Sequence, residues 1–167
     1  MYRPLVMGIL NVTPDSFYDG GRYSASSAAV DQCRTMLQEG ADIIDIGGYS
    51  SRPGATDIPE DEELARVIPV IGQLVQEFPD IVISIDTFRS HVAREAVEAG
   101  ARIVNDISGG TQDSNMAKTV AALKVPYILM HMKGTPQTMA RLAVYDDLLT
   151  EIMTYFSLRI HQLREAG

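Results

Sequence analysis

The sequence predicts an α/β fold built on a parallel β-sheet, and two features indicate it. Five short segments rich in Ile, Val and Leu alternate with segments whose apolar residues recur at helical spacing. The short segments are uniformly apolar instead of alternating with polar residues, which is typical of strands that are buried on both faces. We therefore expect five βα units within the 167 residues.

The expected elements follow one another without a linker. Strands are expected at Leu5–Val12, Asp42–Ile46, Ile81–Ile85, Arg102–Ile107 and Tyr127–Met130. Helices are expected at Ser26–Glu39, Glu60–Phe78, Ser90–Ala99, Asn115–Leu123 and Tyr145–Ala166. Pro69 lies inside the second helical segment, so a kink is expected there, or a break into two shorter helices.

Two near repeats indicate how large the complete fold would be. Gly40–Asp45 and Gly100–Asn105 lie 60 residues apart, and each opens with a glycine where a left-handed cap would end the preceding helix. That spacing equals two units of about 30 residues in a (β/α)₈ TIM barrel, which needs roughly 240 residues to close. We therefore expect residues 1–167 to be one domain, a TIM barrel truncated to about five parallel βα units, with no second domain. The final Glu-Ala-Gly resembles the start of a further repeat, and an open sheet would expose its edges and its inner apolar face.

Composition excludes several classes of function. Fourteen basic against 22 acidic side chains give a net charge of −8, so we expect neither nucleic acid nor an anionic membrane surface as a partner. The single cysteine, Cys33, cannot form an internal disulfide, and its place in a helix favours core packing over a nucleophilic role. No apolar run approaches the roughly 18 residues of a membrane span. We expect a cytoplasmic protein without a signal peptide.

Polar side chains follow each expected strand. The first strands end at Asn11 and Asp45, the third at Asp86, and the fourth at Asn105 and Asp106. Because ligands bind at the carboxyl ends of parallel strands, this pattern predicts a polar binding pocket. The alternative is that such residues cap helices or form turns. We favour ligand binding for Asp86 and Asn105, and the capping role for Asp45 and Asp106.

Two polar loops extend this edge. Gly47–Gly54 combines three glycines and two serines with Arg52, a composition that lets an anion approach, although an ordinary exposed loop would look similar. Asn11–Gly21 is rich in turn-forming residues and contains aromatic ones. The three histidines lack the spacing of zinc ligands. A hard cation held by Asn11 and completed by phosphates remains open.

Together these segments resemble the dihydropteroate synthases of the pterin-binding TIM-barrel superfamily. The resemblance covers the whole chain and is carried by Met7–Phe17, Gly47–Gly54, Ser84–Thr87, Asn105–Ser108 and Leu129–Met132, in the order of the family. It implies a transferase of folate biosynthesis, the target of sulfonamides. The reaction would condense 6-hydroxymethyl-7,8-dihydropterin pyrophosphate with 4-aminobenzoate, and would release 7,8-dihydropteroate and pyrophosphate.

The resemblance also implies roles for individual residues. Asn11 and Arg52 would be catalytic, and Asn11 would ligate the Mg²⁺ that holds pyrophosphate. Substrate would be bound by Ser51, Pro53, Asp86, Asn105, Ile107 and Met130. Thr13, Asp15 and Phe17 would belong to a mobile loop. Ser51 stands where threonine is more usual in the family, a change that keeps the hydroxyl group.

The resemblance is incomplete, because the family continues with further strands that contribute an aspartate, a lysine and an Arg/His pair. We therefore expect the isolated 167-residue chain to be inactive, and the full-length enzyme to be a homodimer. Two other hypotheses remain. One is a methyltetrahydrofolate methyltransferase, which would not need the segments suited to pyrophosphate. The other is a non-catalytic pterin-binding module.

Overall fold

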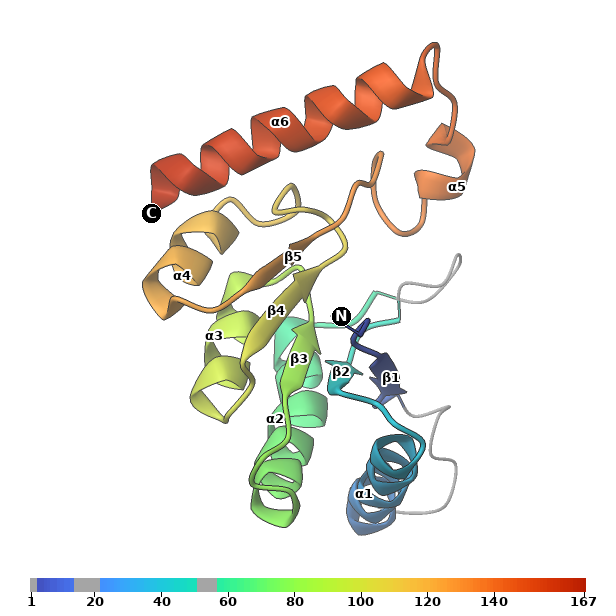
Figure 1. The fold of residues 1–167 in the computed structure, drawn as a ribbon, viewed down its shortest axis with the longest axis vertical. Helices are drawn as coiled ribbons and strands as arrows, with labels where there is room; N and C mark the ends of the chain where they lie inside the picture. Colours follow the sequence, from blue (N-terminus) through green and yellow to red (C-terminus); the bar gives the residue numbers. More distant parts are fainter. Residues whose placement is uncertain (1–2, 14–21, 51–56) are drawn as a thin grey trace.

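The computed structural model describes residues 3–13, 22–50 and 57–167, and shows alternating strands and helices (Figure 1). The strands are β1 (Met7–Asn11), β2 (Ile43–Gly47), β3 (Ile83–Asp86), β4 (Ile103–Asp106) and β5 (Tyr127–Leu129). The helices are α1 (Arg22–Gln38), α2 (Glu60–Glu77), α3 (Ser90–Glu98), α4 (Met116–Leu123), α5 (Met139–Leu142) and α6 (Leu148–Ala166). None of these helices is both long enough and apolar enough to cross a membrane.

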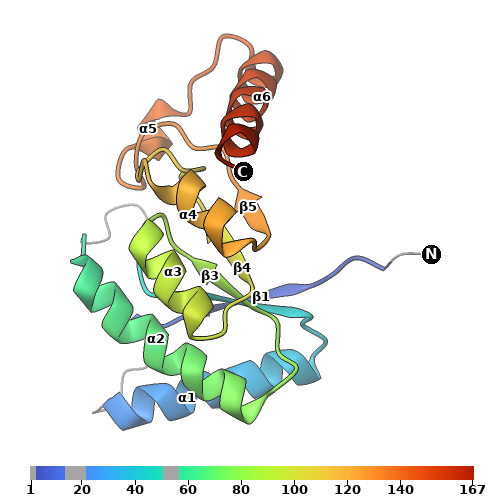
Figure 2. The ribbon, with the colours of Figure 1, turned by 90° about the vertical axis from the view of Figure 1, so that its left-hand side faces the viewer.

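The five strands form one parallel sheet in the order β1-β2-β3-β4-β5. Successive right-handed crossovers in one direction place every connecting helix on the same face of a sheet. Helices α1 to α4 accordingly lie side by side along one face (Figures 1 and 2). The predicted α/β class with five parallel strands is confirmed, and the sequential strand order is that of an arc of a TIM barrel.

Burial differs sharply between the two faces of the sheet. The side chains that face the helices are buried, with Leu10 2% exposed and Ile46, Ile85 and Val104 0% exposed. On the opposite face, which we call the inner face, Ile9 is 63% exposed. The prediction that the strands are buried on both faces is confirmed in the middle of the sheet, where the inward-facing Asp45 of β2 and Ser84 of β3 are 4% and 0% exposed. It is wrong for β1, whose inner face no described element covers. The expected exposure of an inner apolar face is confirmed.

Some element boundaries differ from those expected. Helix α2 continues through Pro69, so the predicted break is wrong. The proline removes one backbone donor, whereas the buried side chains of Val67, Val70, Ile71 and Leu74 hold both halves of the helix against the sheet. Helix α1 starts four residues before the expected Ser26, and the short helix α5 was not predicted.

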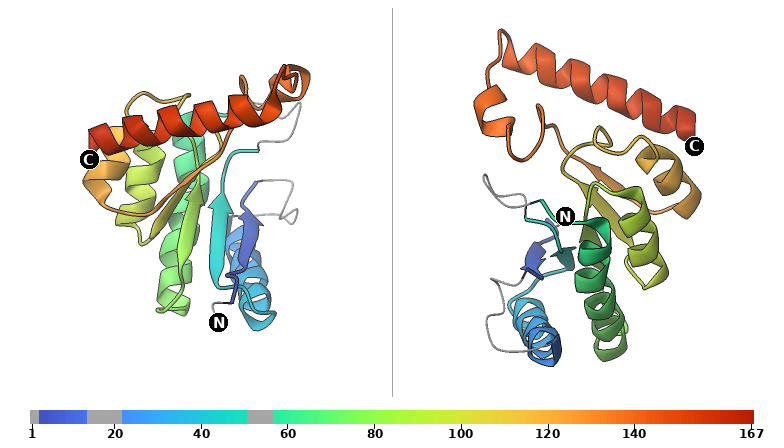
Figure 3. Two further views of the ribbon diagram at one scale, coloured as in Figure 1. Left: turned by 45° about the horizontal axis from the view of Figure 1, so that its top comes forward. Right: turned by 180° about the vertical axis from the view of Figure 1, so that it is seen from behind.

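Helix α6 begins later than expected, at Leu148, where the Asp147 side chain accepts a hydrogen bond from the Thr150 N–H. It lies beside α4 and contacts the loops that follow β4 and β5 (Figure 3). The Tyr155 hydroxyl donates to the Ser108 carbonyl at 3.2 Å, and Arg159 Nε donates to the Gly109 carbonyl at 2.7 Å. These bonds fix α6 at the carboxyl edge of the sheet.

Cys33 is fully buried in α1, as predicted. Burial raises the pKa of its thiol to about 11. The thiol is therefore protonated at neutral pH and packs as a small apolar side chain.

The near repeats end α1 and α3 in the same way. Gly40 and Gly100 have φ angles of 102° and 122°. At Gly100 the backbone N–H donates to the Val97 carbonyl, and the next N–H donates to the Ala96 carbonyl; Gly40 has the equivalent bonds. Both ends are therefore Schellman caps, and each directs the chain into the following strand.

A buried ion pair holds both described flanks of the connection between β2 and α2. The Glu63 side chain is 0% exposed and accepts hydrogen bonds from Thr87 Oγ1 at 2.7 Å and Arg89 Nη1 at 2.6 Å. Arg89 Nη2 donates to the Ile58 carbonyl at 2.6 Å, and the guanidinium lies 5.4 Å from the centre of the Tyr49 ring. Residues 49 and 58 lie on opposite sides of residues 51–56, so one arginine fixes both flanks.

The two capping glycines should respond differently to the same substitution. Gly40→Ala should cost about 1 kcal/mol, because alanine disfavours positive φ but a Cβ there meets no atom within 4 Å. Gly100→Ala should cost more, because its Cβ would lie 2.7 Å from Val75 Cγ2. Urea denaturation of both variants measures the difference. Equal losses would show that packing against Val75 is unimportant.

Arg89→Ala should lower the free energy of unfolding by about 3 kcal/mol or more, because it leaves the buried Glu63 carboxylate without its cation. The matched control is Arg34→Ala, which removes an exposed pair with Asp31 and Glu77 and should cost much less than Arg89→Ala. Urea midpoints compare the two. Similar midpoints would contradict the anchoring role of Arg89.

Candidate functional site

Three of the predicted polar residues lie in one row across the sheet. The strand register pairs Asn11 with Gly47, Gly47 with Asp86, and Asp86 with Asn105. Residues that pair in register project from the same face, here the inner face near the carboxyl ends of the strands. The structure therefore brings together Asn11, Asp86 and Asn105, which lie far apart in the sequence.

Gly47 keeps the centre of this row open. A Cβ at this position would lie 3.4 Å from Asp86 Oδ2 and 3.5 Å from Asn11 Oδ1. A larger side chain would fill the space between these oxygens. The glycine thus leaves room for a group that contacts both neighbouring strands.

A second polar layer lies two residues earlier on the same face. Asp45 pairs in register with Ser84, and both side chains are buried, with Asp45 4% exposed and Ser84 0% exposed. Asn105 Nδ2 donates a hydrogen bond to Asp45 Oδ2 at 2.9 Å. The capping role predicted for Asp45 is wrong, because Asp45 lies within β2 and supports Asn105. The near repeat could have predicted this placement, because Asp45 and Asn105 occupy the same position in it.

Asp106 has the structural role that the sequence predicted. Its carboxylate accepts hydrogen bonds from the backbone N–H groups of Ser108 and Gly110 at 2.7 and 2.8 Å, and from the Tyr127 hydroxyl at 2.7 Å. These bonds fix the turn that follows β4. The carboxylate is therefore occupied within the protein and is not available to a ligand.

The carboxyl group of Asp86 gains and loses its proton near neutral pH. Burial, followed by the charges of Asp45, Glu63 and Asp106, raises its pKa to about 7. Burial also raises the pKa of Asp45, partly offset by the nearby Ser84 hydroxyl and by the hydrogen bond from Asn105. At neutral pH the row therefore presents two amides and one carboxyl group that can accept or give up a proton. Such a set can pair with a polar heterocycle that carries adjacent donors and acceptors.

The other predicted residues fall into two groups. Ile107 is half-buried directly after β4, and Met130 is 38% exposed directly after β5, so both border the row. Thr13 is half-buried just beyond β1. Asp15, Phe17, Ser51, Arg52 and Pro53 lie outside the described residues.

The described residues contain no cluster of three or more His, Cys, Asp or Glu side chains that could hold a metal ion by themselves. Asn11 is exposed at the end of β1 and offers one amide oxygen beside the space above Gly47. Mg²⁺ prefers oxygen ligands, and commonly takes few from the protein and the rest from phosphates and water. This donor set fits an ion that arrives with a phosphorylated ligand.

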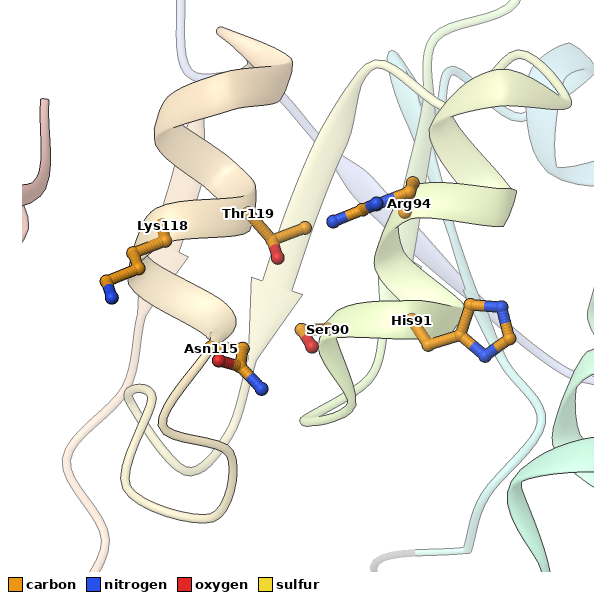
Figure 4. A pocket seen from close by; sticks show the side chains of 6 residues that line it. All are labelled: Ser90, His91, Arg94, Asn115, Lys118 and Thr119. Carbon is orange, nitrogen blue, oxygen red and sulfur yellow. The ribbon is translucent and has the colours of Figure 1, made fainter.

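A separate groove of about 400 Å³ lies between α3 and α4 (Figure 4). It is lined by Ser90, His91, Arg94, Asn115, Lys118 and Thr119; Ser90 and Asn115 point toward each other across it, whereas the His91 and Lys118 side chains point outward. Asp113 accepts hydrogen bonds from the Ser90 and Asn115 N–H groups, so these helix-terminal donors are satisfied. The groove contains none of the residues of the row.

The high pKa of Asp86 predicts a pH-dependent effect of Asp86→Asn. A carboxyl whose pKa rises from 3.8 to about 7 on folding lowers stability as the pH rises between these values, because the folded state retains the proton longer. Asn cannot ionise, so the variant should gain more stability at pH 8 than at pH 5, by about 2 kcal/mol. Thermal denaturation at both pH values measures this difference.

Asp42→Asn provides a control of opposite sign. The hydrogen bond from the Val6 N–H lowers the pKa of Asp42, so this substitution should be more destabilising at pH 8 than at low pH. An Asp86→Asn effect that is equal at pH 5 and pH 8 would contradict the assigned environment of Asp86.

Comparison with known proteins agrees with this geometry. The sequence profile described as "pterin binding enzyme" matches residues 7–167. The dihydropteroate synthase of Synechocystis sp. is 52% identical over 165 residues, which are 99% of this chain and 57% of that protein.

Two solved structures of the Xanthomonas albilineans dihydropteroate synthase are also similar. The structure with 4-aminobenzoic acid has a TM-score of 0.88 and 47% identity, and covers 99% of this chain and 57% of the other. The structure with 7,8-dihydropteroate has a TM-score of 0.83 and 42% identity, and covers 99% and 56%. This chain thus spans a little over half the length of these dihydropteroate synthases. The chain belongs to the pterin-binding enzyme family.

Proposed function

We propose that this chain forms the pterin-holding part of a dihydropteroate synthase. The row of Asn11, Asp86 and Asn105 on the inner face carries the proposal, because it places polar groups where a flat heterocycle can lie against the sheet. The similarity to dihydropteroate synthases over 99% of the chain supports the reaction class. The reaction joins the methylene carbon of 6-hydroxymethyl-7,8-dihydropterin pyrophosphate to the amine of 4-aminobenzoate and releases pyrophosphate.

Asp86 and Asn105 would recognise the pterin ring. A pterin displays N–H donors beside ring nitrogen and carbonyl acceptors along its edge. A carboxyl and an amide at neighbouring register positions can pair with such an edge, and burial makes each missing hydrogen bond costly. Ile107 and Met130 would contact the faces of the ring.

Asn11 would act at the pyrophosphate. Its amide oxygen would supply one ligand to Mg²⁺, and the bound ion would stabilise negative charge on the leaving pyrophosphate. The position of Asn11, across Gly47 from Asp86, would hold the pyrophosphate near the ring that Asp86 recognises.

The remaining roles are assigned to the two loops. Ser51, Arg52 and Pro53 would contact the pyrophosphate and the aminobenzoate, and Thr13, Asp15 and Phe17 would cover the reacting groups. The ion pair of Glu63 and Arg89 supports this assignment, because Arg89 also contacts residues 49 and 58, which flank residues 51–56. The rest of the pocket would come from the part of the family's length that this chain does not span.

Binding and turnover test the proposal separately. Titration with 6-hydroxymethylpterin should show saturable binding, and Asp86→Ala should weaken it at least 100-fold, since the ring would lose a buried partner. Lys118→Ala, in the groove between α3 and α4, serves as a matched control and should leave the affinity unchanged.

Mg²⁺-dependent affinity for pyrophosphate distinguishes a dihydropteroate synthase from a methyltransferase, which has no pyrophosphate to bind. In a protein that also contains the remaining part of the family's length, formation of dihydropteroate from both substrates distinguishes an enzyme from a pterin-binding module, and a sulfonamide should compete with 4-aminobenzoate. Pterin binding that does not depend on Asp86 would contradict the proposed site.

A further inference from the structure

Asp45 is a buried carboxylate that has no part in the reaction outlined above. It lies within β2 in the layer beneath the row, is 4% exposed, and contacts the row through Asn105. Its Oδ2 accepts the hydrogen bond from Asn105 Nδ2 at 2.9 Å. This hydrogen bond is the direct contact between the Asp45 carboxylate and the row.

The unused polar atoms around Asp45 argue against a purely structural role. Asp45 Oδ1 and Ser84 Oγ make no hydrogen bond of regular geometry among the described residues, although Ser84 lies close enough to Asp45 to lower the pKa of its carboxyl group. Burying a carboxylate with one oxygen unpaired costs stability, and an apolar side chain would fill the position at no such cost. Apolar side chains do occupy other positions of the same layer, since Ile9 pairs with Asp45 and Ile103 pairs with Ser84.

The chemistry of the contact determines the orientation of the Asn105 amide. An ionised carboxylate only accepts hydrogen bonds, whereas an amide has a donor end and an acceptor end. The Nδ2 end must therefore face Asp45, because the reverse orientation would bring oxygen against oxygen. A hydrogen bond to a charged acceptor is also stronger than one between neutral groups.

We propose that Asp45 is a positioning residue that fixes the Asn105 amide, so that the carbonyl oxygen Oδ1 is the end available to the pterin. This inference rests on the proposed pterin site. Asp45 would thereby set which donors and acceptors of a heterocycle the site accepts, without touching the ligand. Asp45 is also one of the charges that raise the pKa of Asp86, so it influences both residues that would read the ring.

Asp45→Asn tests the proposal, because asparagine keeps the size of the side chain but can face either end of the Asn105 amide. The substitution should weaken binding of 6-hydroxymethylpterin at least 10-fold. Ser84→Ala alters the buried residue that pairs with Asp45 in register but keeps both partners of the Asn105–Asp45 hydrogen bond, and should change the affinity less than twofold. In an Asn105→Ala background, Asp45→Asn should have less than a twofold effect, because the group that it orients is gone.

NMR of the side-chain amide of Asn105 provides a readout that a merely structural role would not move. In the unliganded protein the two Nδ2 protons of Asn105 should exchange slowly with solvent, and the one bonded to Asp45 should resonate downfield. Asp45→Asn should abolish both effects. An unprotected Asn105 amide in the wild type would overturn the proposal even if the variant failed to fold.

The outcomes separate the two proposals. A wild-type protein that does not bind the pterin would refute the proposed function and this inference with it. Two results would refute this inference alone, provided that pterin binding depends on Asp86. One is a loss of affinity from Asp45→Asn that is equal in the wild-type and Asn105→Ala backgrounds. The other is a loss smaller than twofold in the wild-type background.

Discussion

The parallel register of β1 to β4 is the constraint on which the site depends. It brings Asn11, Gly47, Asp86 and Asn105 to one level, although they are separated by up to 94 residues in the sequence. A slip of one residue in any strand would turn its polar side chain toward the helices, where apolar groups pack. The site is therefore a direct consequence of the pairing of the strands.

The helical layer protects that register. Leu10, Ile46, Ile85 and Val104 alternate with the polar row and are buried under the helices, so each strand is held by its outer side chains. The inner side chains are then free to carry charge and hydrogen-bonding groups. The high pKa of Asp86 reflects this division, because several carboxyl groups lie close together at the edge of an apolar core. The apolar packing lies on one face of the sheet, and the row of polar side chains lies on the other.

The sequence was sufficient for the fold class and for identifying three polar residues that the structure brings into one row. Uniform apolar runs and the repeated glycine caps predicted the five βα units, and the polar strand ends predicted Asn11, Asp86 and Asn105. Asp45 was misassigned because a polar residue near a strand end looks the same whether it caps a turn or supports a neighbour, and only the register shows the difference. The ion pair of Glu63 and Arg89 was missed because the partners lie 26 residues apart in different elements. Helix α5 is too short to carry a periodic signal.

The central claim is that a pterin lies on the inner face of the sheet against the row. A crystal structure of the protein with bound 6-hydroxymethylpterin tests it most directly. The account predicts that the ring edge is hydrogen-bonded to the carboxyl group of Asp86 and to Oδ1 of Asn105, with Asn105 Nδ2 still bonded to Asp45. A ring bound elsewhere, such as the groove between α3 and α4, or bound on the inner face without contact to Asp86 and Asn105, would contradict it.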